Sequence, residues 1–135
     1  MKPLATYRHI MSGWLLLMVS AVLVILLTTL PRSTPPIGFI ANVLDHTVMG
    51  DTIGHALLFA CFTLIAYYAL RQFLAAGMAF TLAVGGVLLM ATLTETHQAV
   101  ILSRASTESD LLANWFGVLF AAVWLNHRAT LSRWG

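Results

Sequence analysis

Four long apolar segments occupy most of this 135-residue chain and constrain its fold more than any other feature. They run from about residues 14 to 30, 53 to 70, 75 to 94 and 111 to 125. Each is close to the roughly 17–25 residues that cross a bilayer as a helix. Because backbone N–H and C=O groups in lipid must be satisfied within the segment, the segments are expected to be helical. The sequence therefore predicts an all-α protein, a small polytopic membrane bundle of about four transmembrane helices.

The scarcity of charge supports a membrane protein. Only 9% of the residues are charged, against about 25% in an ordinary soluble domain, so a soluble fold of this size would lack polar groups to cover its surface. The basic residues form no stripe or cluster, and we expect no nucleic-acid partner. We expect a single domain over residues 1–135, with helices at about 13–30, 52–70, 75–95 and 110–126.

The first apolar segment has a second interpretation, a cleaved signal peptide, because Lys2 and Arg8 precede it. However, its apolar core is long for a signal, and the sequence from Thr28 to Pro31 (Thr-Thr-Leu-Pro) does not match a small-x-small cleavage site. We therefore expect an uncleaved helix.

The distribution of Lys and Arg predicts the orientation. With an even number of helices, one side of the membrane receives Lys2, Arg8, Arg71, Arg128 and Arg133. The other side receives only Arg32 and Arg104. By the positive-inside rule, both termini are expected in the cytoplasm, with residues 31–50 and 96–109 outside. Residues 37–44 show near-helical apolar spacing and are predicted as a short helix on the outer surface.

Seven polar residues are predicted to meet at the outer ends of the last three helices. Asp51 and His55 are four residues apart at the start of one helix and therefore share a face. Glu95 and Gln98 come at the end of the next. The other three lie in the following loop and at the start of the last helix: Arg104, Asp110 and Asn114.

The last helix is expected to turn its polar pair into the bundle. Ala113, Gly117 and Ala121 form a small-x-x-x-small seam that allows close helix packing, and Asp110 and Asn114 lie near the same face. Ionisable residues at membrane depth usually face the interior and pair with one another. We expect Arg104 to pair with at least one of three acids, Asp51, Glu95 and Asp110.

Other chemistries fit this cluster less well. The acids with His55 and His97 could ligate a divalent metal, but no compact motif such as His-Glu-x-x-His is present, so no metal site is predicted. The sequence has no Gly-rich phosphate loop and no Gly-x-Ser-x-Gly elbow, and no cofactor is expected. A structural latch of capped helix ends is the simplest alternative to a ligand site.

In their order and spacing, these residues resemble the VanZ-like family of bacterial membrane proteins. The likeness covers about Asp51 to Gly117: Asp51-x-x-x-His55, Glu95-x-x-Gln98, then Arg104, Asp110, Asn114 and Gly117. The sequence departs from the family pattern at Thr52, where Lys is frequent, and at Ile101–Ser103, where an aromatic residue and a Pro are frequent. The resemblance implies location in the bacterial inner (cytoplasmic) membrane. The founding member of the family is linked with resistance to teicoplanin, a lipoglycopeptide that acts on the outer side.

Three functions follow as hypotheses. In the first, the outer polar pocket binds a lipid headgroup, a lipid-linked envelope precursor or a lipoglycopeptide, and its ligand-binding residues are the seven above. In the second, the protein is a membrane-embedded enzyme acting on such a lipid, with candidate catalytic residues His55, Asp51 and Glu95. In the third, it is a structural subunit of an envelope complex with a membrane-protein partner. The sequence leaves open whether any reaction is catalysed.

Overall fold

A computed structural model describes residues 4–29, 50–101 and 108–131 and, within these ranges, consists of four α-helices. Side chains are described at residues 11–26, 52–97, 100 and 108–130. The helices are α1 (Leu4–Thr29), α3 (Gly50–Leu70), α4 (Ala76–Ile101) and α5 (Glu108–Leu131). The prediction of an all-helical chain with four helices is confirmed over the ranges described.

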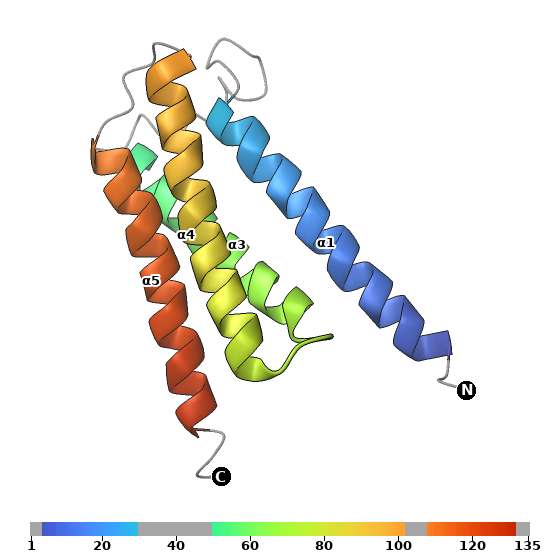
Figure 1. The fold of residues 1–135 in the computed structure, drawn as a ribbon. Coiled ribbons are helices and arrows are strands. Elements are labelled where there is room, and N and C mark those ends of the chain that lie inside the picture. Colours follow the sequence, from blue (N-terminus) through green and yellow to red (C-terminus); the bar gives the residue numbers. More distant parts are fainter. Residues whose placement is uncertain (1–3, 30–49, 102–107, 132–135) are drawn as a thin grey trace.

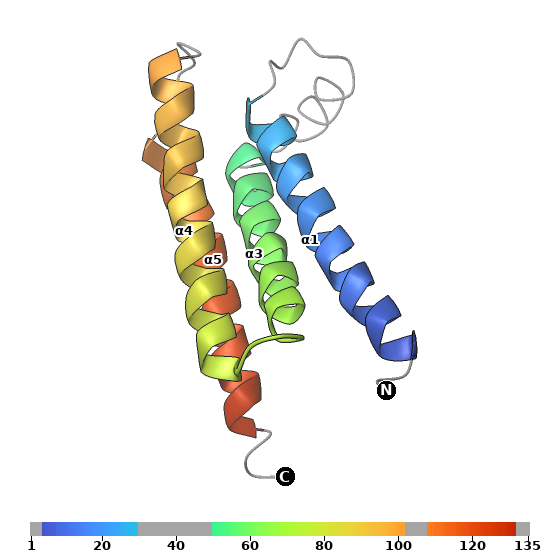
Figure 2. The same ribbon diagram turned by 45° about the vertical axis from the view of Figure 1, so that its right-hand side comes forward.

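Successive helices run in opposite directions, so that α1 begins and α5 ends at the same end of the bundle (Figure 1). The most extensive helix–helix contact is between α3 and α5, and α3 also contacts α1 and α4. Figure 2 shows α1 leaning away from the other helices toward its N-terminal end. All four helices thus pack into one bundle, with Val24 of α1 in its core, and the polar residues of interest lie on α3, α4 and α5.

The connection between α3 and α4 is a tight turn around Arg71. The backbone N–H of Arg71 still donates to the carbonyl of Tyr67, while Phe73 and Leu74 both donate to the carbonyl of Leu70. The Arg71 side chain donates from Nη1 to the carbonyl of Leu74 at 2.8 Å. The backbone bonds satisfy carbonyls at the C-terminal end of α3 that have no partner within the helix, and the turn joins α3 and α4 as an antiparallel hairpin.

Small residues bring α3 and α5 together. The seam predicted on α5 is buried, with Ala121 fully inaccessible and Ala113 nearly so. A Cβ added at Gly117 would overlap the backbone carbonyl of Ala56 on α3. The absence of a side chain at Gly117 therefore permits this close approach. Larger apolar side chains, with Phe59 and Val118 at the centre, fill the rest of the core.

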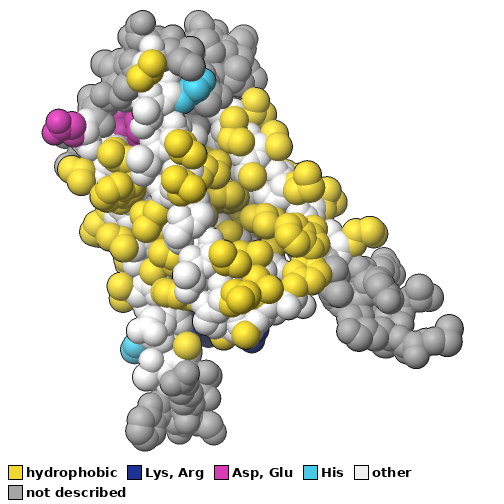
Figure 3. Space-filling view, in the orientation of Figure 1, with side chains coloured by type: hydrophobic (Ala, Val, Ile, Leu, Met, Phe, Trp, Pro, Cys, Tyr) yellow, Lys and Arg dark blue, Asp and Glu magenta, His cyan; other side chains and the backbone are white. Residues whose placement is uncertain are grey.

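Apolar side chains also cover the outside of the bundle. In Figure 3 they spread over the middle of the visible face, with acidic and His side chains toward one end and basic and His side chains toward the other. By length and composition, two of the described segments are sufficient to cross a membrane, Thr52–Leu70 and Ala76–His97, while a shorter apolar stretch in α1 covers Met11–Leu26. That all four helices cross a bilayer stays a prediction.

The helices lie where the apolar segments predicted them, but all four are longer, α3 by only two residues. α1 begins at Leu4, not near residue 13, α4 continues to Ile101, and α5 covers 108–131, not 110–126. Hydropathy marks where side chains avoid water, whereas backbone hydrogen bonding continues through polar residues with adequate helix propensity. The predicted surface helix at residues 37–44 lies outside the described residues.

Candidate functional site

Asn114 joins three helices through two side-chain hydrogen bonds. From α5, its Nδ2 donates to Oε1 of Glu95 on α4 at 2.9 Å. Its Oδ1 lies 2.9 Å from Nδ1 of His55 on α3. Asn114 is fully buried and Glu95 is 4% exposed, whereas His55 is only partly buried. The structure thus brings together one predicted residue from each of the three helices in a single chain of hydrogen bonds.

The N-terminal ends of two helices favour negative charge near this chain of hydrogen bonds. The N-terminal ends of α3 and α5 lie at this end of the bundle, where helix dipoles stabilise carboxylates. Asp110 and Glu108 both lie in the first turn of α5. Burying a carboxylate such as that of Glu95 is costly unless hydrogen-bond donors compensate it, and the amide of Asn114 supplies one. The hydrogen bond from Asn114 therefore partly offsets the free-energy cost of removing the Glu95 carboxylate from water.

A second polar contact lies beside the first. Nε1 of Trp115 on α5 donates to Oγ1 of Thr92 on α4 at 3.2 Å, and the Thr92 hydroxyl donates to the carbonyl of Leu88 at 2.9 Å. One turn of α5 therefore contacts α4 through both Asn114 and Trp115, which fixes the rotation of the two helices about their axes.

The remaining predicted site residues are placed less completely. Asp51 lies in the first turn of α3 and Gln98 in the last turn of α4, but neither side chain is described. Asp110 lies one turn before Asn114 on α5 and is partly exposed. Arg104, with its predicted pairing to the acids, lies outside the described residues. Among the residues with described side chains, no group of three or more His, Cys, Asp or Glu could hold a metal ion.

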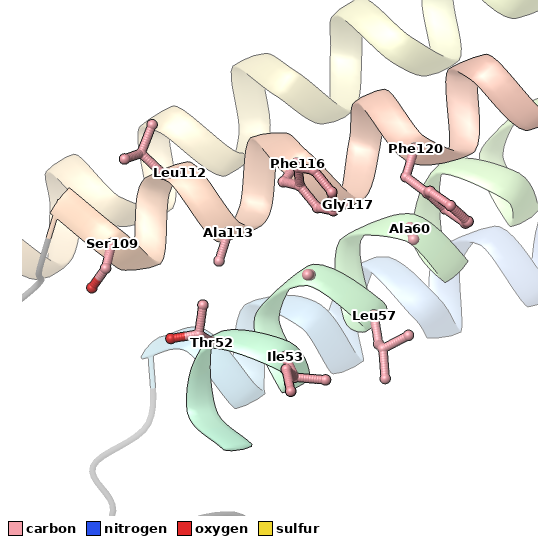
Figure 4. A pocket seen from close by; sticks show the side chains of 11 residues that line it. Thr52, Ile53, Leu57, Ala60, Ser109, Leu112, Ala113, Phe116, Gly117 and Phe120 are labelled. Carbon is pink, nitrogen blue, oxygen red and sulfur yellow. The ribbon is translucent and has the colours of Figure 1, made fainter. Parts of the chain in front are cut away.

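A long groove runs between α3 and α5. It encloses about 630 Å³, and Figure 4 shows side chains from both helices along it. Its walls include the exposed apolar side chains Leu57, Leu112, Phe116 and Phe120. Ala56 and Gly117, where the two backbones touch, also line the groove. The groove is therefore an apolar depression on the surface of the bundle, formed where small residues leave space between α3 and α5.

The groove has one polar end. Thr52 and Ser109, the first lining residues of α3 and α5, carry the hydroxyl groups seen at one end of Figure 4. His55 lies one turn below Thr52 on α3, and Asn114 follows Ala113, which lines the groove. The groove and the hydrogen-bonded residues His55 and Asn114 thus occupy the same turns of α3 and α5.

This groove was not predicted from the sequence. A signal for it was present, because Ala56 and Ala60 on α3 match the small-x-x-x-small spacing of Ala113 and Gly117 on α5. Two facing small-residue seams predict a close contact. The size of the space beside that contact depends on the rotamers of flanking Phe and Leu side chains, which spacing does not determine.

Comparisons with models of protein families, with curated proteins and with solved structures found no match to this chain.

Proposed function

We propose that this chain is a multi-pass membrane protein of the bacterial inner (cytoplasmic) membrane that binds an amphiphile at the outer ends of α3, α4 and α5. The ligand is a membrane lipid, a lipid-linked envelope precursor or a lipoglycopeptide. Its polar group meets the polar cluster around His55, and an acyl chain lies in the groove between α3 and α5. The single observation that carries the proposal is the shared position of the buried polar chain and the apolar groove on the same turns of these two helices.

Support for membrane insertion comes from the exposure of the apolar helices. Only 28% of the apolar window in α3 and 22% of that in α4 are buried within the bundle. A core helix of a soluble protein would be mostly buried. On α5, Leu112, Phe116 and Phe120 are each more than 60% exposed, on one face. Contiguous apolar surface of this extent marks a membrane or partner interface, and lipid is the partner that covers every side of a bundle.

Support for a ligand at the polar cluster comes from the free energy that burying its polar groups costs. A purely structural latch of helix ends needs caps at the helix N-termini, which Ser109 and Asp110 can supply. It does not need a carboxylate and an amide buried between α4 and α5, because an apolar pair of similar size packs as well or better. Buried polar groups that exceed the needs of folding are commonly kept for function. The likeness to the VanZ-like family agrees with this proposal.

The experiment is photo-crosslinking with a phospholipid that carries a diazirine on its acyl chain, using protein in lipid nanodiscs. The wild-type protein is expected to be labelled on groove residues such as Leu112 and Phe116. Ala60→Phe, which fills the groove, should abolish this labelling. Leu89→Phe places the same ring on an exposed position of α4 and should leave it intact. Equal labelling of both variants, or labelling spread evenly over the exposed faces, would show that the groove is not a lipid site.

A second candidate function, a membrane-embedded enzyme acting on the same lipid, has one observation in its favour. His55 is hydrogen-bonded through Asn114 to a buried carboxylate, an arrangement that orients an imidazole for general acid–base catalysis. The test is turnover, measured by comparing the lipids of cells that express wild-type protein or His55→Ala. Unchanged lipid composition between the two would exclude the enzymatic function.

A further inference from the structure

A second apolar groove lies between α1 and α4. It encloses about 400 Å³, and Ile25 of α1 forms one of its walls. From α4, its walls include Gly86, Leu89 and Leu93. Figures 1 and 2 both show that α1 and α4 diverge toward the N-terminal end of α1. The groove is therefore part of the gap between two diverging helices, and the described side chains do not fill it.

Gly86 deepens this groove without serving a contact between helices. A Cβ added there would meet no described atom within 4 Å, in contrast to Gly117. The neighbouring Gly85 has the same open surroundings but does not line the groove. Leu89 and Leu93 are 61% and 59% exposed, so the groove opens onto the apolar outer surface of the bundle. An occupant would therefore enter from the lipid that is proposed to surround the helices.

His97 gives the groove one polar end. Its side chain is exposed, and it lies near the C-terminal end of α4. Gly86 and His97 are eleven positions apart on this helix, which corresponds to a rise of about 16 Å. The hydrocarbon core of a bilayer is about 30 Å thick, so the groove extends over about half of it. These dimensions match one leaflet, with His97 at the level of the headgroups and Gly86 near the middle of the membrane.

The size and chemistry of the groove select its occupant. A helix with its side chains is at least about 10 Å across, so a helical segment as long as the groove would need far more than this volume. A free phosphate ion would leave the apolar walls uncovered. An acyl chain is thin and flexible enough to lie along them. At the polar end, an imidazole N–H of His97 is a donor that a phosphate oxygen can accept. A phospholipid combines the two groups that the groove requires.

From these dimensions and this polar end, we propose that the groove between α1 and α4 binds a single phospholipid from the leaflet on the side of His97. One acyl chain lies over Gly86, between Ile25 and Leu89, and His97 donates a hydrogen bond to the phosphate. The lipid thereby fills the gap between α1 and α4, and packing of this kind drives association within hydrocarbon. The inference rests on the membrane insertion in the proposed function. The two grooves share no lining residue among those described, so each site can fail without the other.

The site is tested by counting the phospholipids that the purified protein retains in native mass spectrometry, with phosphatidylglycerol as the probe. Gly86→Leu places a side chain in the groove and should lower retention at this site about tenfold. Gly85→Leu places the same side chain in equally open space outside the groove and should retain the lipid. Ala60→Phe fills the groove between α3 and α5 and should also leave this lipid bound.

The possible outcomes separate the two sites. Loss of one lipid in Gly86→Leu alone would support the site between α1 and α4 and count against the groove between α3 and α5. Loss in Ala60→Phe alone would leave the proposed function standing and overturn this site. Equal retention by Gly86→Leu and Gly85→Leu would overturn it as well, and a wild-type protein that retains no phospholipid would overturn both.

The contact with His97 is tested with two lipids that have the same acyl chains, phosphatidylglycerol and diacylglycerol, of which only the first carries a phosphate. We expect about tenfold stronger retention of phosphatidylglycerol, as for a hydrogen bond to a charged group. His97→Ala should lower this preference, and His97→Gln, which keeps a donor, should restore part of it. His127→Ala removes an exposed imidazole from the far end of α5 and should leave the preference unchanged. The same preference in His97→Ala and His127→Ala would refute the contact with the phosphate.

Discussion

Nδ2 of Asn114 on α5 lies 2.9 Å from Oε1 of Glu95 on α4, and both side chains are buried. The two residues are 19 positions apart in the sequence, on antiparallel helices joined by a loop. Only the ends of α4 and α5 near that loop can bring them together, so their contact fixes how far the two helices are displaced along each other. The oxygen of the same amide contacts His55, which extends this constraint to α3.

Truncation of Asn114 should destabilise the bundle strongly. Asn114→Ala removes the donor to the buried carboxylate of Glu95 and the acceptor for His55. Leaving a buried polar group without its partner costs about 1–3 kcal/mol, and more when the group is charged, so we expect a loss of about 3 kcal/mol. The measurement is unfolding in mixed detergent and denaturing surfactant, followed by circular dichroism.

Asn126→Ala is the matched control for this change. Asn126 lies on the same helix but is exposed at its far end, and surface substitutions usually change stability by no more than about 0.5 kcal/mol. A similar loss of stability in Asn114→Ala and Asn126→Ala would show that the interhelical hydrogen bonds contribute little.

The contact between α3 and α5 predicts opposite effects of one substitution at two glycines. Gly117→Ala places a methyl group against the backbone carbonyl of Ala56, which cannot move without separating the helices. Overpacking of this kind costs about 1–3 kcal/mol. A Cβ at Gly85, within α4, would meet no atom within 4 Å, so Gly85→Ala should stabilise the helix by about 0.5–1 kcal/mol.

Both glycine variants are measured in the same unfolding assay, and Gly117→Ala should also reduce lipid crosslinking, because separation of α3 and α5 widens the groove. A stabilised Gly117→Ala would contradict the close backbone approach.

The positions of the helices and the buried seam of α5 could be predicted because each depends on local pattern alone. The lengths of the apolar segments located all four helices, and the spacing of Ala113, Gly117 and Ala121 identified the buried face of α5. The helix ends were predicted less well. α4 continues through Glu95 to Ile101 because polar residues end contact with lipid without ending helical hydrogen bonding.

Within the polar cluster, the sequence predicted which residues approach one another but not which bonds they make. In the enzymatic hypothesis Asp51 orients His55 and Glu95 is its partner; the contact with Asp51 stays a prediction, because the Asp51 side chain is not described. The structure shows that His55 contacts Asn114 and that Asn114 contacts Glu95. Helical spacing gives the face of a side chain, whereas the choice between two partners on that face depends on displacement and rotation of neighbouring helices by a few tenths of a turn. Those quantities are set by the packing of the whole bundle.

Arg104 carries a prediction that rests on the sequence. It is the basic residue nearest to Asp51, Glu95 and Asp110 in the expected topology, and several carboxylates at the edge of a low-dielectric layer need a cation. Arg104→Ala should therefore destabilise the protein by about 1.5–3 kcal/mol, as expected for hydrogen bonds to charged groups. Arg32→Ala, in a loop without acids close in sequence, should have little effect in the same assay. Comparable effects of the two variants would argue that Arg104 does not pair with the acids.

The orientation of the bundle in the membrane is the remaining prediction. α1 begins and α5 ends at one end (Figure 1), and Arg71 and Arg128 lie at that end, whereas Glu95 and Asp110 lie at the other. Because cytoplasmic segments are enriched in Lys and Arg, the first end should face the cytoplasm and the polar cluster should face outward. Alkaline phosphatase, which is active only outside the cytoplasm, should be active when fused after Asn42 and inactive when fused after Arg133. The reverse pattern would place His55, Asn114 and Glu95 at the cytoplasmic side, where a lipoglycopeptide acting from outside could not reach them.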